Sequence, residues 1–333
     1  TAKSQAGLWS NEVEVDTTAP DAPTASLAPA SDSGTLGDAI TSDNTPTVQG
    51  TGTPGDTITV TFPGGEVQTV VVGNTGSWSV TPTNPLADGL NNISVTATDP
   101  AGNTSPATTV PVTIDTTPPA APAADVAAAS DTGSSSTDNN TKINTPVFTG
   151  SGSPGDTITI KDGTTVLGTA VVDGSGNWTF TAPASLTDGV HQITTTVTDT
   201  AGNTSAPSPA LAVTIDTTAP SAPVIAPTNG SAITGTGEPG STVTVMNGST
   251  PVGTAVVAPD GSWTITPTSA LPNGTQLTAT QVDAAGNISG PDTETVDASV
   301  PSVPDLTAAT DSGNSTDNNT NINTPIFTGS GTA

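Results

Sequence analysis

Residues 112–119 read V-T-I-D-T-T-P-P, and residues 213–220 read V-T-I-D-T-T-A-P. Weaker copies of this pattern are V-E-V-D-T-T-A-P at residues 13–20 and T-V-D-A-S-V-P at residues 295–301. Each copy is a short run rich in Val and Thr that ends at an Asp, with a Pro shortly after it, which is typical of a strand that runs into a turn. Successive Asp residues are 99, 101 and 81 residues apart, so the pattern predicts a tandem array of small domains.

The four linker Asp residues divide the chain into five parts. They are the end of a preceding repeat, three complete repeats (domains 1, 2 and 3) and the start of a fourth repeat, at residues 1–15, 16–115, 116–216, 217–297 and 298–333. A complete repeat contains short alternating runs between turn residues, such as I-S-V-T-A-T at residues 93–98. About seven such strands in about 100 residues predict an all-β fold of tandem immunoglobulin-like β-sandwich domains in an elongated rod.

Domain 3 is shorter than the other two in one place only. An insert rich in Ser and Asp is missing there, whereas the other repeats carry it at residues 31–38, 130–138 and 311–317. Domain 3 has P-T-N-G-S-A-I instead, at residues 227–233. A segment that varies while the rest of the repeat stays constant is typical of a surface loop.

The composition excludes several classes of protein. Thirty residues are Asp or Glu and only 3 are Lys or Arg, which gives a formal net charge of −27. So acidic a surface repels nucleic acid, and a coiled coil needs far more Leu, Lys and Arg. The sequence has no apolar run of the length that a membrane helix needs, and we expect neither a leader nor membrane insertion.

The motifs D-T-T-x-P, S-D-x-G, G-[SN]-W, L-x-D-G and T-D-x-A-G-N-x-S resemble those of bacterial Ig-like repeats in giant type I-secreted, calcium-binding adhesins. The resemblance covers essentially the whole chain. It implies a secreted virulence protein at the bacterial cell surface, with a long stalk, Ca²⁺ at the domain junctions and attachment to a host cell-surface receptor or glycan. We expect the stalk to be monomeric along the rod.

The motif positions also predict where the Ca²⁺ ligands lie. In a seven-stranded sandwich the loop between the last two strands lies at the pole where the chain enters, so it faces the preceding linker. The expected ligands are Asp16, Asp99 and Asn103, then Asp115, Asp199 and Asn203, then Asp216, Asp283 and Asn287, and finally Asp297. Several oxygen ligands with few cations nearby are what Ca²⁺ requires. The alternative is that these side chains only stabilise turns.

The insert lies at the opposite pole in this topology, where the chain leaves each domain. Its carboxylates would face the next linker and supply a further Ca²⁺ site, from Asp32 and Asp38, from Asp131 and Asp138, and from Asp311 and Asp317. Because domain 3 lacks the insert, we expect one ion fewer at the junction that follows it. The alternative is a solvated turn, in which case the junctions would not differ.

Each complete domain contains one Trp in its G-[SN]-W motif, namely Trp78, Trp178 and Trp263. Each shares a strand face with an apolar residue two positions later, which favours an inward side chain. If they were exposed, the three rings could bind host glycans, so a carbohydrate-recognition module is the alternative function, beside an inert Ig-like spacer of a larger secreted protein. With His191 as the only His and no Cys, we expect no enzyme.

Overall fold

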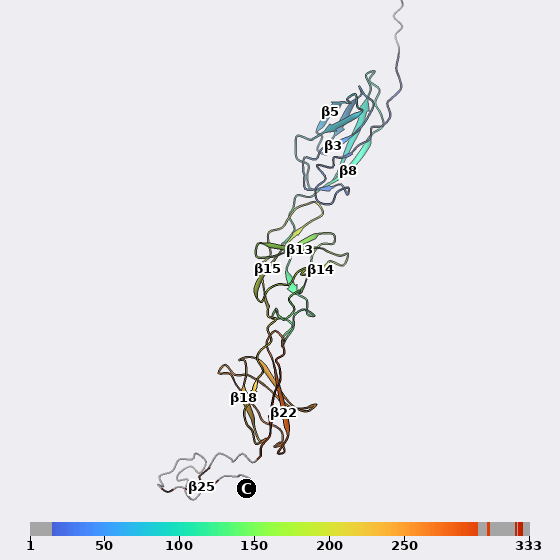
Figure 1. Ribbon diagram of the computed structural model, residues 1–333. Helices are drawn as coiled ribbons and strands as arrows, with labels where there is room; N and C mark the ends of the chain where they lie inside the picture. Colours follow the sequence, from blue (N-terminus) through green and yellow to red (C-terminus); the bar gives the residue numbers. More distant parts are fainter. Residues whose placement is uncertain (1–14, 299–304, 307–323, 325, 329–333) are drawn as a thin grey trace, which may run out of the picture.

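The computed structural model describes residues 15–298, 305–306, 324 and 326–328, and every regular element in them is a β-strand. Figure 1 shows three β-sandwiches in a row along the chain, from domain 1 at the N-terminal side to domain 3 at the C-terminal side. The predicted all-β fold of tandem immunoglobulin-like sandwiches is therefore confirmed. In the described part there is no helix long and apolar enough to cross a bilayer.

Only a small part of the fourth repeat is described. Its strands β24 (Asp305–Leu306) and β25 (Phe327–Thr328) pair in the antiparallel sense. The predicted ligands Asp311 and Asp317, and most of the repeat end at residues 1–15, lie outside the described residues.

Domain 1 consists of a five-stranded and a three-stranded sheet. The larger sheet has the order β2-β8-β7-β4-β5, with bounds Ile40–Thr41, Thr108–Ile114, Gly89–Thr98, Thr57–Thr61 and Val67–Val71. The smaller sheet has the order β1-β3-β6, with bounds Ser26–Leu27, Val48–Thr51 and Ser77–Val80. All pairs are antiparallel except that of β2 with β8, which is parallel.

Domain 2 repeats this arrangement. Its sheets have the orders β10-β16-β15-β12-β13 and β14-β11-β9. The bounds in the first sheet are Asn140–Thr141, Leu211–Ile215, Gly189–Thr198, Thr157–Asp162 and Thr165–Val171. Those in the second are Asn177–Thr181, Val147–Ser151 and Ala124–Val126.

Domain 3 has one strand fewer. Its sheets are β20-β19-β22-β23, with bounds Thr250–Val256, Thr242–Asn247, Gln276–Val282 and Asp292–Thr295, and β17-β18-β21, with bounds Val224–Ile225, Ile233–Thr236 and Ser262–Ile265. Within its described residues there is no counterpart of β2 and β10, because those strands follow directly on the insert that domain 3 lacks. Its last strand, β23, therefore lies at the edge of the sheet.

The alternation of side chains explains the strands and the core. Along β7, Ile93, Val95 and Ala97 are buried while the residues between them are not. In domain 2, Trp178 lies across Gly150 of the neighbouring strand β11, and a Cβ at that glycine would be 2.6 Å from the Trp178 Cζ2. In every domain a glycine is paired with the Trp on the neighbouring strand, and its missing side chain leaves space for the indole ring between the sheets.

Candidate functional site

Each domain binds the linker in front of it through the same hydrogen bond. We call residues 99–103, 199–203 and 283–287 the A-G-N loops; the Asn that ends each loop donates from its side-chain amide to the main-chain oxygen of the linker Asp. The N···O distances are 3.1 Å from Asn103 to Asp16, 2.8 Å from Asn203 to Asp115 and 2.8 Å from Asn287 to Asp216. The predicted approach of these loops to the preceding linkers is therefore confirmed.

The Asp that begins each A-G-N loop holds the Asn in place. Asp199 accepts the main-chain N–H of Asn203 at 2.8 Å and its side-chain amide at 3.0 Å, one on each carboxylate oxygen. Asp99 and Asp283 make the same two bonds. The side-chain amide of Asn103 is the main cause that lowers the pKa of Asp99, and the main-chain bonds add to it. The Asp99 carboxylate is therefore charged, and its hydrogen bonds are part of the loop structure.

The linker carboxylates also stabilise their own turns. Oδ1 of Asp16, of Asp115 and of Asp216 accepts the N–H of the Thr two residues later, each at 3.0 Å. This is the turn role that the sequence leaves open as the alternative. The turn uses Oδ1 of each carboxylate and not Oδ2.

The linkers are tied to the preceding domain as well. In domain 2, Asp188 accepts hydrogen bonds from the hydroxyls of Thr217 and Thr218 and from the N–H of Thr217. The Thr217 hydroxyl is the main cause that lowers the pKa of Asp188. Asp88 of domain 1 holds Thr116 and Thr117 in the same way. Each of these linkers is therefore fixed from both sides.

A buried carboxylate lies behind the A-G-N loop of domain 2. Asp156 is 5% exposed, and its pKa is raised, first by burial and then by the negative charge of Asp199. Asp56 occupies the same place in domain 1 and is 3% exposed, whereas Ser241 occupies it in domain 3. The negative charges of Asp156 and Asp199 therefore act on one another at this pole.

The insert of one domain binds directly to the A-G-N loop of the next. From domain 1, the Ser33 hydroxyl donates to the Ala201 oxygen at 2.5 Å, and two main-chain amides donate to the same loop, Thr35 N to Thr200 O at 3.0 Å and Ser42 N to Ala201 O at 3.1 Å. Gly34, which has a φ of 72°, packs so closely that a Cβ there would collide with the Thr200 oxygen. The insert is thus a docking element.

Domain 2 docks on domain 3 in a similar way, but with a charged group. The Thr132 hydroxyl donates to the Ala285 oxygen at 2.6 Å, and the Lys142 ammonium donates to the Gly286 oxygen at 2.7 Å. As Gly34 does in domain 1, Gly133 lies against the loop of the next domain. Lys142 is one of only 3 Lys or Arg residues in the chain, and it places a positive charge at this junction.

Docking changes the burial of the A-G-N loops. Ala201 and Ala285 are each 1% exposed, whereas Ala101, at the same position in domain 1, is exposed. The Ala101 loop has no docked insert among the described residues. The sequence shows the inserts of domains 1 and 2 but not these contacts, which involve hydroxyls, main-chain groups and the Lys142 ammonium. A Gly after the Asp of each insert is the one signal that could have indicated a close approach.

The insert carboxylates have two different environments. Asp38 and Asp138 cap the N–H two residues later, at 2.9 Å and 3.1 Å. Asp32 and Asp131 are buried, and each accepts one main-chain N–H, from Gly37 and from Asn139. Asp297, the last linker Asp, donates its own N–H to the Thr228 oxygen of domain 3. Within the described residues no three Asp, Glu or His side chains form a metal-holding group.

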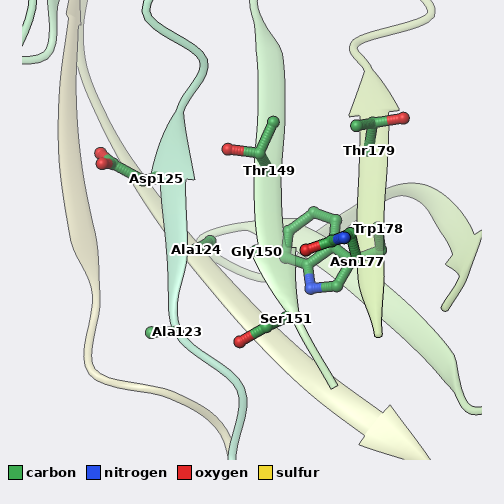
Figure 2. A pocket seen from close by; sticks show the side chains of 9 residues that line it. All are labelled: Ala123, Ala124, Asp125, Thr149, Gly150, Ser151, Asn177, Trp178 and Thr179. Atoms are coloured by element: carbon green, nitrogen blue, oxygen red, sulfur yellow. The ribbon is translucent and has the colours of Figure 1, made fainter. Parts of the chain in front are cut away.

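The three Trp side chains lie in the cores, as their strand positions favour. Trp78, Trp178 and Trp263 are 4%, 2% and 3% exposed. Figure 2 shows a shallow groove on domain 2, where the Trp178 ring lies beneath β11 while Asp125, Thr149 and Thr179 lie in a row across three strands. A buried ring cannot stack on a sugar, so the glycan-binding role considered for these Trp residues does not fit their environment.

Comparisons with known proteins agree with this architecture. The family model described as a bacterial Ig-like domain matches residues 18–116 and 118–217, and one described as a bacterial Ig domain matches residues 219–298. No curated protein matches the chain.

Several solved structures resemble the chain. A tetra-tandem repeat in the extending region of a large adhesion protein is 24% identical, with 86% of this chain and 76% of that chain covered and a TM-score of 0.27. For the BSP domain of a biofilm associated protein the identity is 16%, the coverage 87% and 69%, and the TM-score 0.24. For the fibronectin(III)-like modules of Clostridium thermocellum CbhA these values are 16%, 45% and 83%, and 0.33.

Proposed function

The chain belongs to the bacterial Ig-like domain family, and on this premise we propose that it is a stalk segment of a secreted bacterial surface adhesin. In this proposal the sandwiches form a stiff rod, Ca²⁺ strengthens the junctions, and the rod presents a binding region to a receptor on a host cell. The observation that carries the proposal is the repeated junction. The same amide-to-linker bond occurs in front of all three domains, and an insert docks at both junctions between complete domains.

The junction residues have the chemistry that Ca²⁺ needs. At the junction of domains 1 and 2, the ligands would be Asp115 Oδ2, the Asp199 carboxylate and the Asn203 side-chain oxygen, with buried Asp156 behind them. These are hard oxygen donors, and amide oxygens complement the carboxylates in such sites. The raised pKa of Asp156, caused by burial and by Asp199, supports the fit, because a divalent cation would offset this accumulated negative charge. When bound, Ca²⁺ would cross-link linker and loop.

The chain's own groups prepare the site. Asp199 orients Asn203, Asn203 holds the Asp115 main chain, and the insert of domain 1 limits how far the two domains can bend apart. Sites with few carboxylates bind Ca²⁺ at about 10⁻⁴ to 10⁻³ M, which suits an extracellular protein. Calcium would therefore act as a structural ion of the secreted stalk.

The proposal can be tested by distance measurements across the junction of domains 1 and 2. Ser79 and Thr179 are exposed at equivalent positions, and the chain has no Cys, so Ser79→Cys and Thr179→Cys give two specific spin-label sites. We expect a narrow distance distribution in CaCl₂ and a broader one in EGTA. Asp115→Ala should raise the Ca²⁺ concentration required by roughly tenfold or more, because it removes a charged ligand but not the main-chain oxygen that Asn203 binds.

Asp125→Ala is the matched control, because it removes one carboxylate from domain 2 at the outer face of β9, away from the junction. It should behave as the parent chain. Equally narrow distributions with and without Ca²⁺ would contradict calcium stiffening. The hydrogen bonds between the domains would then be enough to keep the rod stiff. Broad distributions in both conditions would contradict the rod itself.

A further inference from the structure

Three side-chain oxygens in and just after the insert of domain 2 are buried without a hydrogen-bond partner among the described residues. They are Asp131 Oδ1, Asn139 Oδ1 and Asn140 Oδ1. Asp131 is 95% buried, since only 5% of its surface is exposed. Buried acceptors of this kind normally have a partner, and a carboxylate oxygen needs one most.

The local backbone brings Asp131 and Asn139 together. The other oxygen of Asp131, Oδ2, accepts the main-chain N–H of Asn139 at 3.2 Å, so the carboxylate lies against that residue. Asn139 has a φ of 57°, in the left-handed region, at the point where β10 begins. The change from left-handed to extended backbone interrupts the strict alternation of a strand, which allows Asn139 and Asn140 to turn their side chains to the same side.

Within the described residues no ion pair joins Asp131 to a cationic side chain. The nearest Lys in the sequence, Lys142, donates to the Gly286 oxygen of domain 3. The single ion pair within the described residues joins His191 to Asp162, in another part of domain 2. A buried carboxylate oxygen and two amide oxygens, without donors to satisfy them, are a set of ligands for a hard cation.

We propose that the insert of domain 2 binds a cation of its own, of the Ca²⁺ type, through Asp131, Asn139 and Asn140. This site is separate from the linker sites of the proposed function and does not depend on them. It lies at the base of the docking element, because Thr132 and Gly133, the next residues along the chain, contact domain 3. Binding there would fix the insert in its docking conformation.

Domain 1 provides a natural comparison. Its Asp32 is 8% exposed and also has a buried oxygen without a partner, but Ala39 and Ile40 stand where domain 2 has Asn139 and Asn140. Ala39 has almost the same φ, 58°, so the backbone is similar while the two amide oxygens are missing. We therefore expect the domain 2 insert to bind the cation more strongly than that of domain 1. The sequence of the fourth repeat contains D-N-N again, at residues 317–319.

The test is a CaCl₂ titration of the whole chain followed by NMR of the side-chain amides. Ligation through Oδ1 should shift the NH₂ signals of Asn139 and Asn140 together, along one binding curve. Asp131→Asn, which keeps the size of the side chain, should weaken this binding by roughly tenfold or more. Asn139→Gly keeps the left-handed backbone and removes one ligand, so it should weaken binding without unfolding the insert.

Two further arms separate this site from the linkers. Asp115→Ala should leave the Asn139 and Asn140 curves unchanged, because Asp115 lies at the junction in front of domain 2, whereas the domain 2 insert docks at the junction behind it. In domain 1, Ala39→Asn combined with Ile40→Asn should create a comparable curve at Asp32, whereas the parent domain 1 should respond only weakly. The proposal is wrong if Asn139 and Asn140 signals stay constant up to saturating CaCl₂, or if Asp131→Asn leaves their curves unchanged.

Discussion

His191 joins two parts of domain 2 through both nitrogens of its ring. Nδ1 lies 2.7 Å from the Asp162 carboxylate at the end of β12, and Nε2 lies 2.8 Å from the Thr187 oxygen before β15. A carboxylate and a carbonyl only accept hydrogen bonds, so both nitrogens must donate, which requires the charged imidazolium. Burial lowers the pKa of His191, but the bonds to Thr187 and Asp162 and the Asp162 charge outweigh it, and the net pKa is raised above 6.5.

Domain 2 should therefore lose stability as the pH rises through the raised pKa of His191. A group with a raised pKa in the folded state contributes its full stabilisation below its unfolded value, here 6.5, and loses it above the folded value. In calorimetry of the whole chain, the unfolding temperature of domain 2 should fall over this range. His191→Asn, the residue that domain 1 has as Asn91, should abolish the fall, and no other His can replace it. A fall of the same size in His191→Asn would assign it to other groups.

The insert is the element that distinguishes one junction from another. Its two glycines allow a matched experiment, because Gly34 and Gly37 both have a positive φ, at 72° and 91°. A Cβ at Gly34 would collide with the Thr200 oxygen of domain 2, whereas a Cβ at Gly37 would meet nothing within 4 Å. Backbone strain is thus common to both positions, and only Gly34 reports the contact between domains.

Gly34→Ala should widen the distribution of spin-label distances between Ser79→Cys and Thr179→Cys, since domain 2 must move away from the added methyl group. Gly37→Ala should leave the distribution as narrow as in the parent chain. Each change should cost domain 1 about 1 kcal/mol through its left-handed backbone, so their unfolding temperatures should be similar. If both variants broaden the distribution equally, the loop conformation matters and the docking contact does not.

Strands with regular alternation could be predicted from the sequence, and those held by tertiary contacts could not. The runs around Ile58 and Ile93 alternate between apolar and polar residues, and both are strands with buried apolar faces. By contrast, β2 has only two residues, and it forms because β8 offers a parallel partner to Ile40 and Thr41.

The same distinction applies to the site. Fold topology predicts that Asn203 meets Asp115, but the docking of Ser33 and the orphan oxygen of Asn139 depend on side-chain positions that no motif encodes.

At the scale of the molecule, each domain presents different surfaces at its two poles. In domains 1 and 2 the insert lies at one pole and the A-G-N loop at the other, and the loops of domains 2 and 3 accept the insert of the domain before them. A contact between unlike surfaces adds the next copy in the same direction, and it extends as an open array where the rotation between copies does not close a ring. The exposed A-G-N loop of domain 1, with Ala101 at its centre, is thus suited to a further insert-bearing repeat.

The parallel pairing of β2 with β8 determines how the array would respond to mechanical tension. A pull on the chain ends acts along β8 and β16, and their hydrogen bonds to β2 and β10 run across the strands, so several bonds must break at once. In domain 3, β23 has a neighbour on one side only, the antiparallel strand β22, and among the described strands no parallel strand pairs with it. Stretching single molecules by atomic force microscopy should therefore unfold domain 3 first, at the lowest force of the three. Domain 3 can be identified by its shorter increase in contour length, because it releases about 80 residues and not about 100. If the first unfolding event released the longer chain of domain 1 or 2, this prediction would be wrong. If domain 3 unfolds first, the shortest repeat acts as the extensible part of an otherwise stiff tether.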